Sequence, residues 1–244
     1  MDIHKPKPWH GVHEFLKEIG TIVIGVLIAL GAEAVVEKLH EQRLSDEARA
    51  AVRAEIGLDL ANLQRRAQWQ PCIDRRLSEL SDLLTKAERG EPFEPAQTIG
   101  NPGAPLVTTG RWEAATAGGR TSLLGLDEQR NFAGVYSEFA SVFRQELAER
   151  EAWGDLEALE GVTRPSPELL ARARVALAHA RLENWGVRSS LRQAVDFAAR
   201  VGARPTPKGL LAMSTLADRE KLCLPISTTP AEVAKQIRDP LGGF

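Results

Sequence analysis

One uninterrupted apolar run near the N-terminus limits what this chain can fold into. Residues Ile19 to Val36 read IGTIVIGVLIALGAEAVV and carry ten Ile, Leu or Val side chains against a single charge, Glu33. Eighteen helical residues span roughly 27 Å, close to the hydrocarbon thickness of a bilayer. Each of the ten side chains favours insertion by about 0.3–0.6 kcal/mol, which outweighs one carboxylate near the end of the run. We therefore predict a transmembrane helix over residues 19–36.

A cleaved signal peptide is the competing interpretation of this run. A basic tail with Lys5, Lys7 and Lys17 precedes it, and Ala32-Glu33-Ala34 fits the small-x-small cleavage pattern. The helical pattern continues past that site without a break, so we favour an uncleaved signal anchor. Lys38, Arg43, Arg49 and Arg53 on the other side nearly balance these lysines, so the opposite orientation stays an alternative, but a short basic tail, residues 1–18, favours a cytoplasmic N-terminus. The expected location is the bacterial inner membrane, crossed once, with residues 37–244 in the periplasm.

Small residues form a stripe along the predicted transmembrane helix. Thr21, Gly25 and Ala29 recur every four residues, and Ala32 lies close to the same face. Such a stripe lets two helix backbones approach closely in lipid, although small residues are also simply common in membrane helices. Glu33 continues the face by one turn at the membrane boundary. An ionisable residue in a span is a functional candidate, but at the rim it more often reaches water.

The segment Glu18-Ile19 followed by residues 22–30, IVIGVLIAL, resembles an uncharacterised bacterial family of small single-pass membrane proteins. Members have an N-terminal "EI…IVIGILIAL" helix that runs into a charged helical region. The resemblance covers residues 15 to about 65 and is weaker around Trp112 to Tyr136. The chain departs from the family after Leu30, where GAEAVV stands in place of polar amides and a Trp. The resemblance implies architecture and location only.

The rest of the chain predicts an all-α fold. Aromatic residues are only 5% of the chain, and no convincing strand or fixed-period repeat is found. Between Glu37 and Arg89 apolar residues recur every three or four positions, which is typical of an amphipathic, partly coiled-coil-like helix. They are Leu44, Ala48, Val52, Ile56, Leu60, Leu63 and Ala67, then Ile73, Leu77, Leu80, Leu84 and Ala87. Pro71 should kink or break this helix, and residues 45–47 offer a possible fresh start.

Further helices are predicted in residues 90–244, after a Pro/Gly-rich loop over residues 90–110. We expect them at 109–118, 127–159, 166–201, 210–222 and from 230 onward, with an N-cap at Ser166 and a capping box at Thr229. The helix at 127–159 is expected to bury Phe132, Val135, Phe139, Val142 or Phe143, and Leu147. The prediction is a transmembrane helix that continues into a bundle of about four main helices.

Charge and motifs argue against several classes of function. Lys and Arg number 31 against 33 Asp and Glu, a near-balance that argues against a nucleic-acid binder. No nucleotide-binding, zinc-protease or hydrolase motif is present, so we assign no catalytic, cofactor or metal residues. His10, His13 and Glu14 have ligand-like spacing, but solvation in the tail is the favoured interpretation. The pairs Arg65-Arg66 and Arg75-Arg76 are expected on solvated faces, with anion or lipid-headgroup binding as the alternative.

Cys72 and Cys223 are the two cysteines of the chain. In an oxidising periplasm a disulfide between them is the favoured interpretation. It would tie the C-terminal region back onto the long helix. Two unrelated buried thiols are the alternative if the domain is cytoplasmic.

These features predict a structural or interaction protein. Its expected partners are membrane lipid and either further copies of itself or the subunits of a membrane complex, with no cofactor and no nucleic acid. A ligand-sensing bundle that signals through a partner is the alternative, and an enzyme with an unrecognised helical site is a third hypothesis. A polar-lined cavity between helices would favour the last two.

Overall fold

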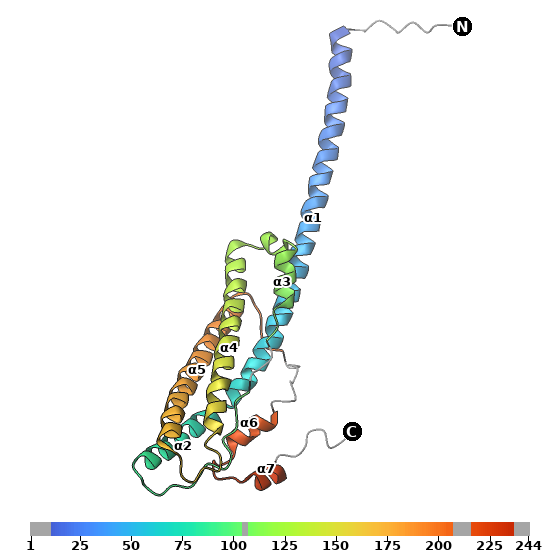
Figure 1. Ribbon diagram of the computed structural model, residues 1–244. Coiled ribbons are helices and arrows are strands. Elements are labelled where there is room, and N and C mark those ends of the chain that lie inside the picture. The colour runs from blue at the N-terminus through green and yellow to red at the C-terminus, as the bar shows by residue number, and fades with distance from the viewer. Residues whose placement is uncertain (1–10, 104–106, 207–215, 237–244) are drawn as a thin grey trace, which may run out of the picture.

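The computed structural model describes residues 11–103, 107–206 and 216–236, and it confirms the all-α prediction: none of these residues lies in a strand. The elements are α1 (Gly11–Gln68), α2 (Gln70–Glu88), α3 (Gly110–Ala117), the 3-10 turn η1 (Arg120–Leu123), α4 (Leu126–Glu157), α5 (Pro167–Arg200), α6 (Leu216–Cys223) and α7 (Pro230–Gln236). Figure 1 shows α1 leaving one end of the bundle as a long rod.

Helix α1 has two parts with different surroundings. Residues 11–43 are almost entirely exposed, and from Ser45 onward the same helix becomes one wall of the bundle. The helix is unbroken at residues 45–47, so the possible fresh start there is not used. From Ala48 to Leu63 the predicted stripe is buried, whereas Ala67 is exposed.

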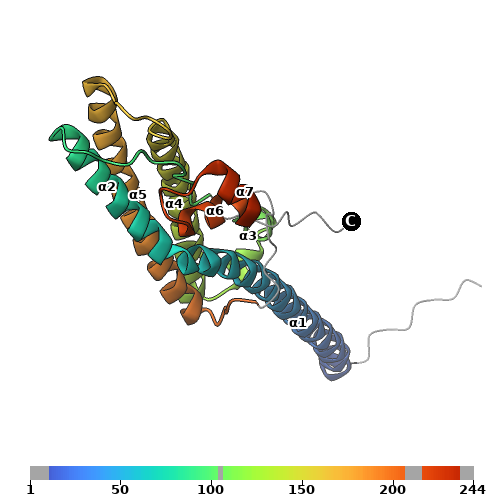
Figure 2. The ribbon, with the colours of Figure 1, turned by 90° about the horizontal axis from the view of Figure 1, so that it is seen from below.

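The break at Pro71 is confirmed. Helix α1 ends at Gln68, and Pro71 lies in the first turn of α2, where a missing N–H removes no helical hydrogen bond. Viewed from below, α2 continues from the end of α1 and lies beside α5 (Figure 2). The predicted long helix is therefore two helices, each with its own buried stripe.

Helices α4 and α5 form an antiparallel hairpin, and their contact is the most extensive one between helices of the bundle. Ser166 caps α5 as predicted, accepting a hydrogen bond from the Leu169 N–H at 3.2 Å. Glycines allow close approach on both helices: a Cβ at Gly134 would lie 2.9 Å from the Phe197 ring, and one at Gly186 would lie 2.9 Å from Gln145. These two contacts also fix the register of the hairpin.

Two hydrophobic clusters lie one after the other along the hairpin. The cluster nearer the exposed part of α1 joins α1, α3, the first half of α4 and the second half of α5. The other joins α2, the second half of α4, the first half of α5 and α6, with Trp153 fully buried in it. The bundle thus has one end at the rod and one end that α6 and α7 cover.

Burial along α4 corrects one prediction. Val142 is buried and Phe143 is exposed, which decides between the two alternatives, but Leu147 is 47% exposed although we expected it inside. Leu147 lies on the flank of α4 away from α5, where no described helix covers it. The capping box of α7 is confirmed, since Glu232 accepts the Thr229 N–H at 2.9 Å. The predicted start of α6 at residue 210 lies outside the described residues.

Candidate functional site: the anchor helix and the polar centres of the bundle

The apolar part of α1 is long enough and apolar enough to cross a membrane. Its most apolar 18-residue window has a mean hydropathy of 2.4, and none of that window is buried in the protein. A core helix of a soluble protein would be covered by neighbouring elements. Exposed Ile, Leu and Val side chains instead surround this helix on all sides, which is the surface that lipid covers at least cost.

The predicted small-residue stripe lies on this exposed rod. Thr21, Gly25, Ala29 and Ala32 are all exposed, and a Cβ built at Gly25 would meet no atom within 4 Å. Thr21 uses its hydroxyl locally, donating to the Lys17 carbonyl oxygen at 2.9 Å. Glu33 is also exposed on the rod. The stripe is therefore open to a second helix, and none of the described elements fills it.

Cys72 and Cys223 lie at disulfide distance, with their Cα atoms 4.9 Å apart. The bond joins the first turn of α2 to the end of α6 across 151 residues of sequence. It fastens the C-terminal helices onto the end of the bundle that lies far from the rod. Of the two alternatives for these thiols, the geometry supports the pair.

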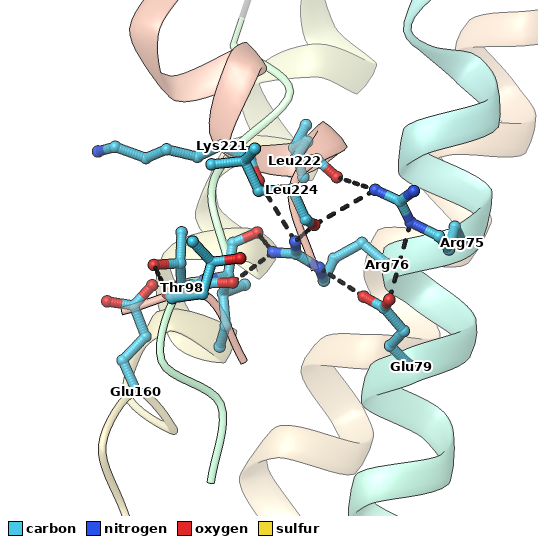
Figure 3. A network of polar contacts seen from close by, with 10 residues as sticks. Arg75, Arg76, Glu79, Thr98, Glu160, Lys221, Leu222 and Leu224 are labelled. Carbon is cyan, nitrogen blue, oxygen red and sulfur yellow. Dashed lines mark hydrogen bonds and ion pairs between the residues drawn. The ribbon is translucent and has the colours of Figure 1, made fainter. Parts of the chain in front are cut away.

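Arg76 lies one turn along α2 from Cys72, at the centre of a polar network (Figure 3). Its guanidinium is fully buried and donates to the carbonyl oxygens of four residues and to the Glu79 carboxylate. The four carbonyls belong to Thr98, Ile99, Lys221 and Leu224. Burial lowers the pKa of Arg76, and the ion pair with Glu79 opposes this. One cation therefore holds together α2, the loop before α3 and the end of α6.

Arg66 forms a second buried centre. Its Nη2 atom donates to both carboxylate oxygens of Glu149, at 3.0 and 2.9 Å, and to the Asn184 side chain at 3.2 Å. Burial raises the pKa of Glu149, and the positive charge of Arg66 opposes the rise. The expectation that the Arg pairs lie on solvated faces is thus wrong for one member of each pair. Helices α4 and α5 cover Arg66, and the loop before α3 and the end of α6 cover Arg76.

A third centre holds α3 against α1. Glu55 is buried and accepts the backbone N–H groups of Arg111 and Trp112, at 2.8 and 3.3 Å, at the start of α3. Tyr136 donates its hydroxyl to the same carboxylate at 2.6 Å and stacks on the Trp112 ring, with centroids 5.1 Å apart. Glu55 therefore caps α3 from another helix, since the Thr109 side chain makes no cap bond.

Asp59 lies one turn along α1 from Glu55 and is almost completely buried. It accepts the Thr108 N–H at 3.1 Å. Burial raises the pKa of Asp59 to about 7, and the nearby Glu55 charge adds to the rise. Two buried carboxylates one turn apart are typical of acid–base chemistry, but backbone donors already occupy both. We interpret Glu55 and Asp59 as structural residues whose carboxylates hold α3 and the segment before it against α1.

Sequence reasoning missed all three centres, although a signal for one was present. Glu55 and Asp59 repeat with the same spacing as their neighbours Ile56 and Leu60 in the buried stripe. Because they lie beside the apolar stripe of α1, these two charged residues indicate that the buried face of the helix is wider than the stripe. Arg66 lies two turns after Asp59 on this widened face and Arg65 does not, but the sequence does not show that the distant Glu149 supplies the charge that lets Arg66 be buried.

The described part of the surface includes the following three hollows. A polar hollow of about 460 Å³ lies between α1 and η1, lined by Lys38, Glu41, Gln42, Ser45, Asp46, Arg49 and Leu123. Two smaller ones, about 220 and 260 Å³, lie along α5 and share Arg188. No group of three or more His, Cys, Asp or Glu residues suited to a metal occurs in the described part of the chain; His10, of the ligand-like tail pattern, lies outside it.

Comparisons with protein-family models, with curated proteins and with solved structures found no match to this chain. The family resemblance of residues 15–65 therefore stays a prediction. The function has to be argued from the anchor helix and the bundle themselves.

Proposed function

We propose that this chain is a membrane-anchored helical scaffold or accessory protein. In this proposal residues 19–36 cross the bacterial inner membrane once, the N-terminus is cytoplasmic and the bundle stands in the periplasm. The protein acts by associating with further copies or with a membrane complex. The observation that carries the proposal is the fully exposed apolar part of α1, which runs without a break into a bundle held by a disulfide and three buried polar centres.

The build of the bundle supports a structural role. Its buried charges are engaged with other parts of the chain: Glu55 binds the start of α3, Arg66 binds Glu149, and Arg76 binds the carbonyls at the end of α6. Such a domain keeps its shape at a fixed distance from the membrane. A disulfide fits the periplasm, where thiols are oxidised, and so supports the proposed orientation.

The first experiment is the native mass of the full-length protein, extracted in mild detergent from its own membrane. We expect the protein to resist an alkaline carbonate wash and to migrate as a homo-oligomer or with a stoichiometric second protein. Protease added to spheroplasts should remove a C-terminal tag. A bare monomer that the carbonate wash releases would contradict the proposal.

The small-residue stripe is tested in the same assay. Gly25→Leu adds a large side chain where two helices would approach, so we expect weaker association in detergent. Ile24→Leu, a neighbour off the stripe, is the control and should associate as the unchanged chain does. Equal association of both variants would show that the anchor helix is not the contact.

The two hollows along α5 support a second candidate, the ligand-sensing bundle. One is lined by Arg66, Arg188 and Arg192 together with the apolar Val187 and Leu191, a combination that suits an organic anion. Thermal unfolding of the full-length protein with and without a set of aliphatic and aromatic carboxylates tests this candidate. A rise in melting temperature that Arg188→Gln abolishes would favour it.

A further inference from the structure

The outer face of α5 carries large apolar side chains that nothing in the described structure covers. Leu182 is 59% and Trp185 63% exposed, and Val175 lies two turns before Leu182 on the same side. Arg181 is exposed one turn before Trp185, where its guanidinium also donates to the Leu77 carbonyl oxygen of α2 at 3.3 Å. Trp and Arg are the residues most enriched at the energetic centre of protein interfaces. This surface, the α5 face, therefore has the composition of a contact surface.

The flank of α4 that points away from α5 has complementary chemistry. Phe143, Leu147, Glu151 and Asp155 follow one another every four residues, and all four are exposed. Gln145, which faces α5 at Gly186, is about 200° around the helix from both Phe143 and Leu147. The row, the α4 flank, is apolar at the end nearer the rod and acidic at the other end.

The register of the hairpin places the two surfaces at the same height. Because Gly134 lies against Phe197 and Gly186 against Gln145, Leu147 is level with Asn184 and Glu151 is level with Ala180. Trp185 is then level with Glu146 and Leu182 with Glu149, both within about 3 Å of the height of Leu147, and Phe143 lies about one turn nearer the rod. Arg181 lies at the height of Glu151. Leu182 and Trp185 match the apolar end of the α4 flank and Arg181 matches Glu151, whereas Val175 is level with Leu156 beside the acidic Asp155.

We propose that the α5 face of one copy packs against the α4 flank of a neighbouring copy in the same membrane. Leu182 and Trp185 then cover Phe143 and Leu147, and Arg181 pairs with Glu151. The inference rests on the proposed function, because α1 holds both copies upright and at equal height. The two surfaces belong to different helices of the hairpin, so the contact is head-to-tail and repeats into a ring or a row.

The test uses the full-length chain in phosphatidylethanolamine and phosphatidylglycerol vesicles, with donor- and acceptor-labelled copies mixed and energy transfer measured against protein density. Arg181→Glu and Glu151→Arg each place like charges opposite each other, and each should weaken association about tenfold. A one-to-one mixture of the two variants, and the double variant, should recover it. Trp185→Ser should weaken association without recovery, and Arg204→Glu, an exposed reversal away from both surfaces, should have no effect.

Each outcome bears on the proposal. Unchanged association of either single variant would overturn this interface, and so would a mixture that fails to recover. If Glu151→Arg has no effect while Trp185→Ser does, the α5 faces meet each other and the head-to-tail arrangement is wrong. If only Gly25→Leu reduces association, self-association stands but runs through the anchor helix. If the unchanged chain is monomeric at every density, the self-association part of the proposed function fails as well.

Discussion

Asp59 shows how burial changes the behaviour of a single side chain. Its carboxyl lies under the segment before α3 and beside Glu55, and its pKa rises to about 7. Between about pH 4 and pH 7, Asp59 is therefore protonated in the folded state and ionised in the unfolded chain. The stabilising effect of that proton is complete below about pH 4 and is lost as the pH rises through 7.

We expect the Asp59→Asn variant to remove this dependence. Asn keeps an oxygen that can accept the Thr108 N–H and has no charge to bury. Between pH 5 and pH 8 the free energy of unfolding should fall less in the variant than in the unchanged chain, by an amount on the order of 1–3 kcal/mol. Urea unfolding of the full-length protein in micelles at both pH values measures it. Parallel pH dependence of the two proteins would contradict the assignment.

Arg76 makes a second prediction at the residue scale. Arg76→Met should lower the free energy of unfolding by about 3–5 kcal/mol, because it leaves the carbonyls of Thr98 and Ile99 without their donor in the interior. Arg75→Met is the matched control. Arg75 also donates to Leu222 and Leu224, but its side chain is half exposed, so the loss should stay within about 1 kcal/mol. Equal losses of unfolding free energy in the two variants would show that the burial of Arg76 does not explain its contribution to stability.

At the scale of elements, the α4–α5 hairpin depends on close approach at particular glycines. Gly134 lets the Phe197 ring lie where a Cβ would be 2.9 Å away, whereas Gly154 on the same helix has open space beside it. The same substitution should therefore have opposite effects at the two positions.

Gly134→Ala is expected to destabilise the protein by about 1–3 kcal/mol through overpacking. Gly154→Ala should stabilise it by about 0.5–1 kcal/mol, since alanine loses less backbone freedom in a helix. Urea midpoints of the two variants decide the matter. Stabilisation by both would show that the ring of Phe197 shifts without cost.

At the scale of the whole molecule, the disulfide joins the end of the bundle that lies far from the rod. It closes a loop of 151 residues, for which the chain-entropy model gives about 5 kcal/mol of stability. Adding reductant should therefore lower the unfolding midpoint markedly. The Cys72→Ser/Cys223→Ser double variant should show the lower midpoint without reductant and no further change with it. A midpoint insensitive to reductant in the unchanged protein would contradict a bond between these cysteines.

Local sequence signals determined the anchor helix, the break at Pro71, the caps of α5 and α7, and the helical class of the fold. Each of these depends on hydropathy or on hydrogen bonds within a few residues, so the sequence carries it directly. The cysteine pairing followed from a count of two and the expected compartment.

Only the tertiary structure decided which charged and apolar residues lie inside. Arg66 continues the buried face of α1, and its charge is accommodated there because Glu149 approaches from 83 residues away. Leu147 fits the helical pattern of a core residue, yet it is exposed because none of the described helices covers that flank of α4. Whether a position is covered depends on how separate helices pack, and periodicity along one helix holds no information about its neighbours.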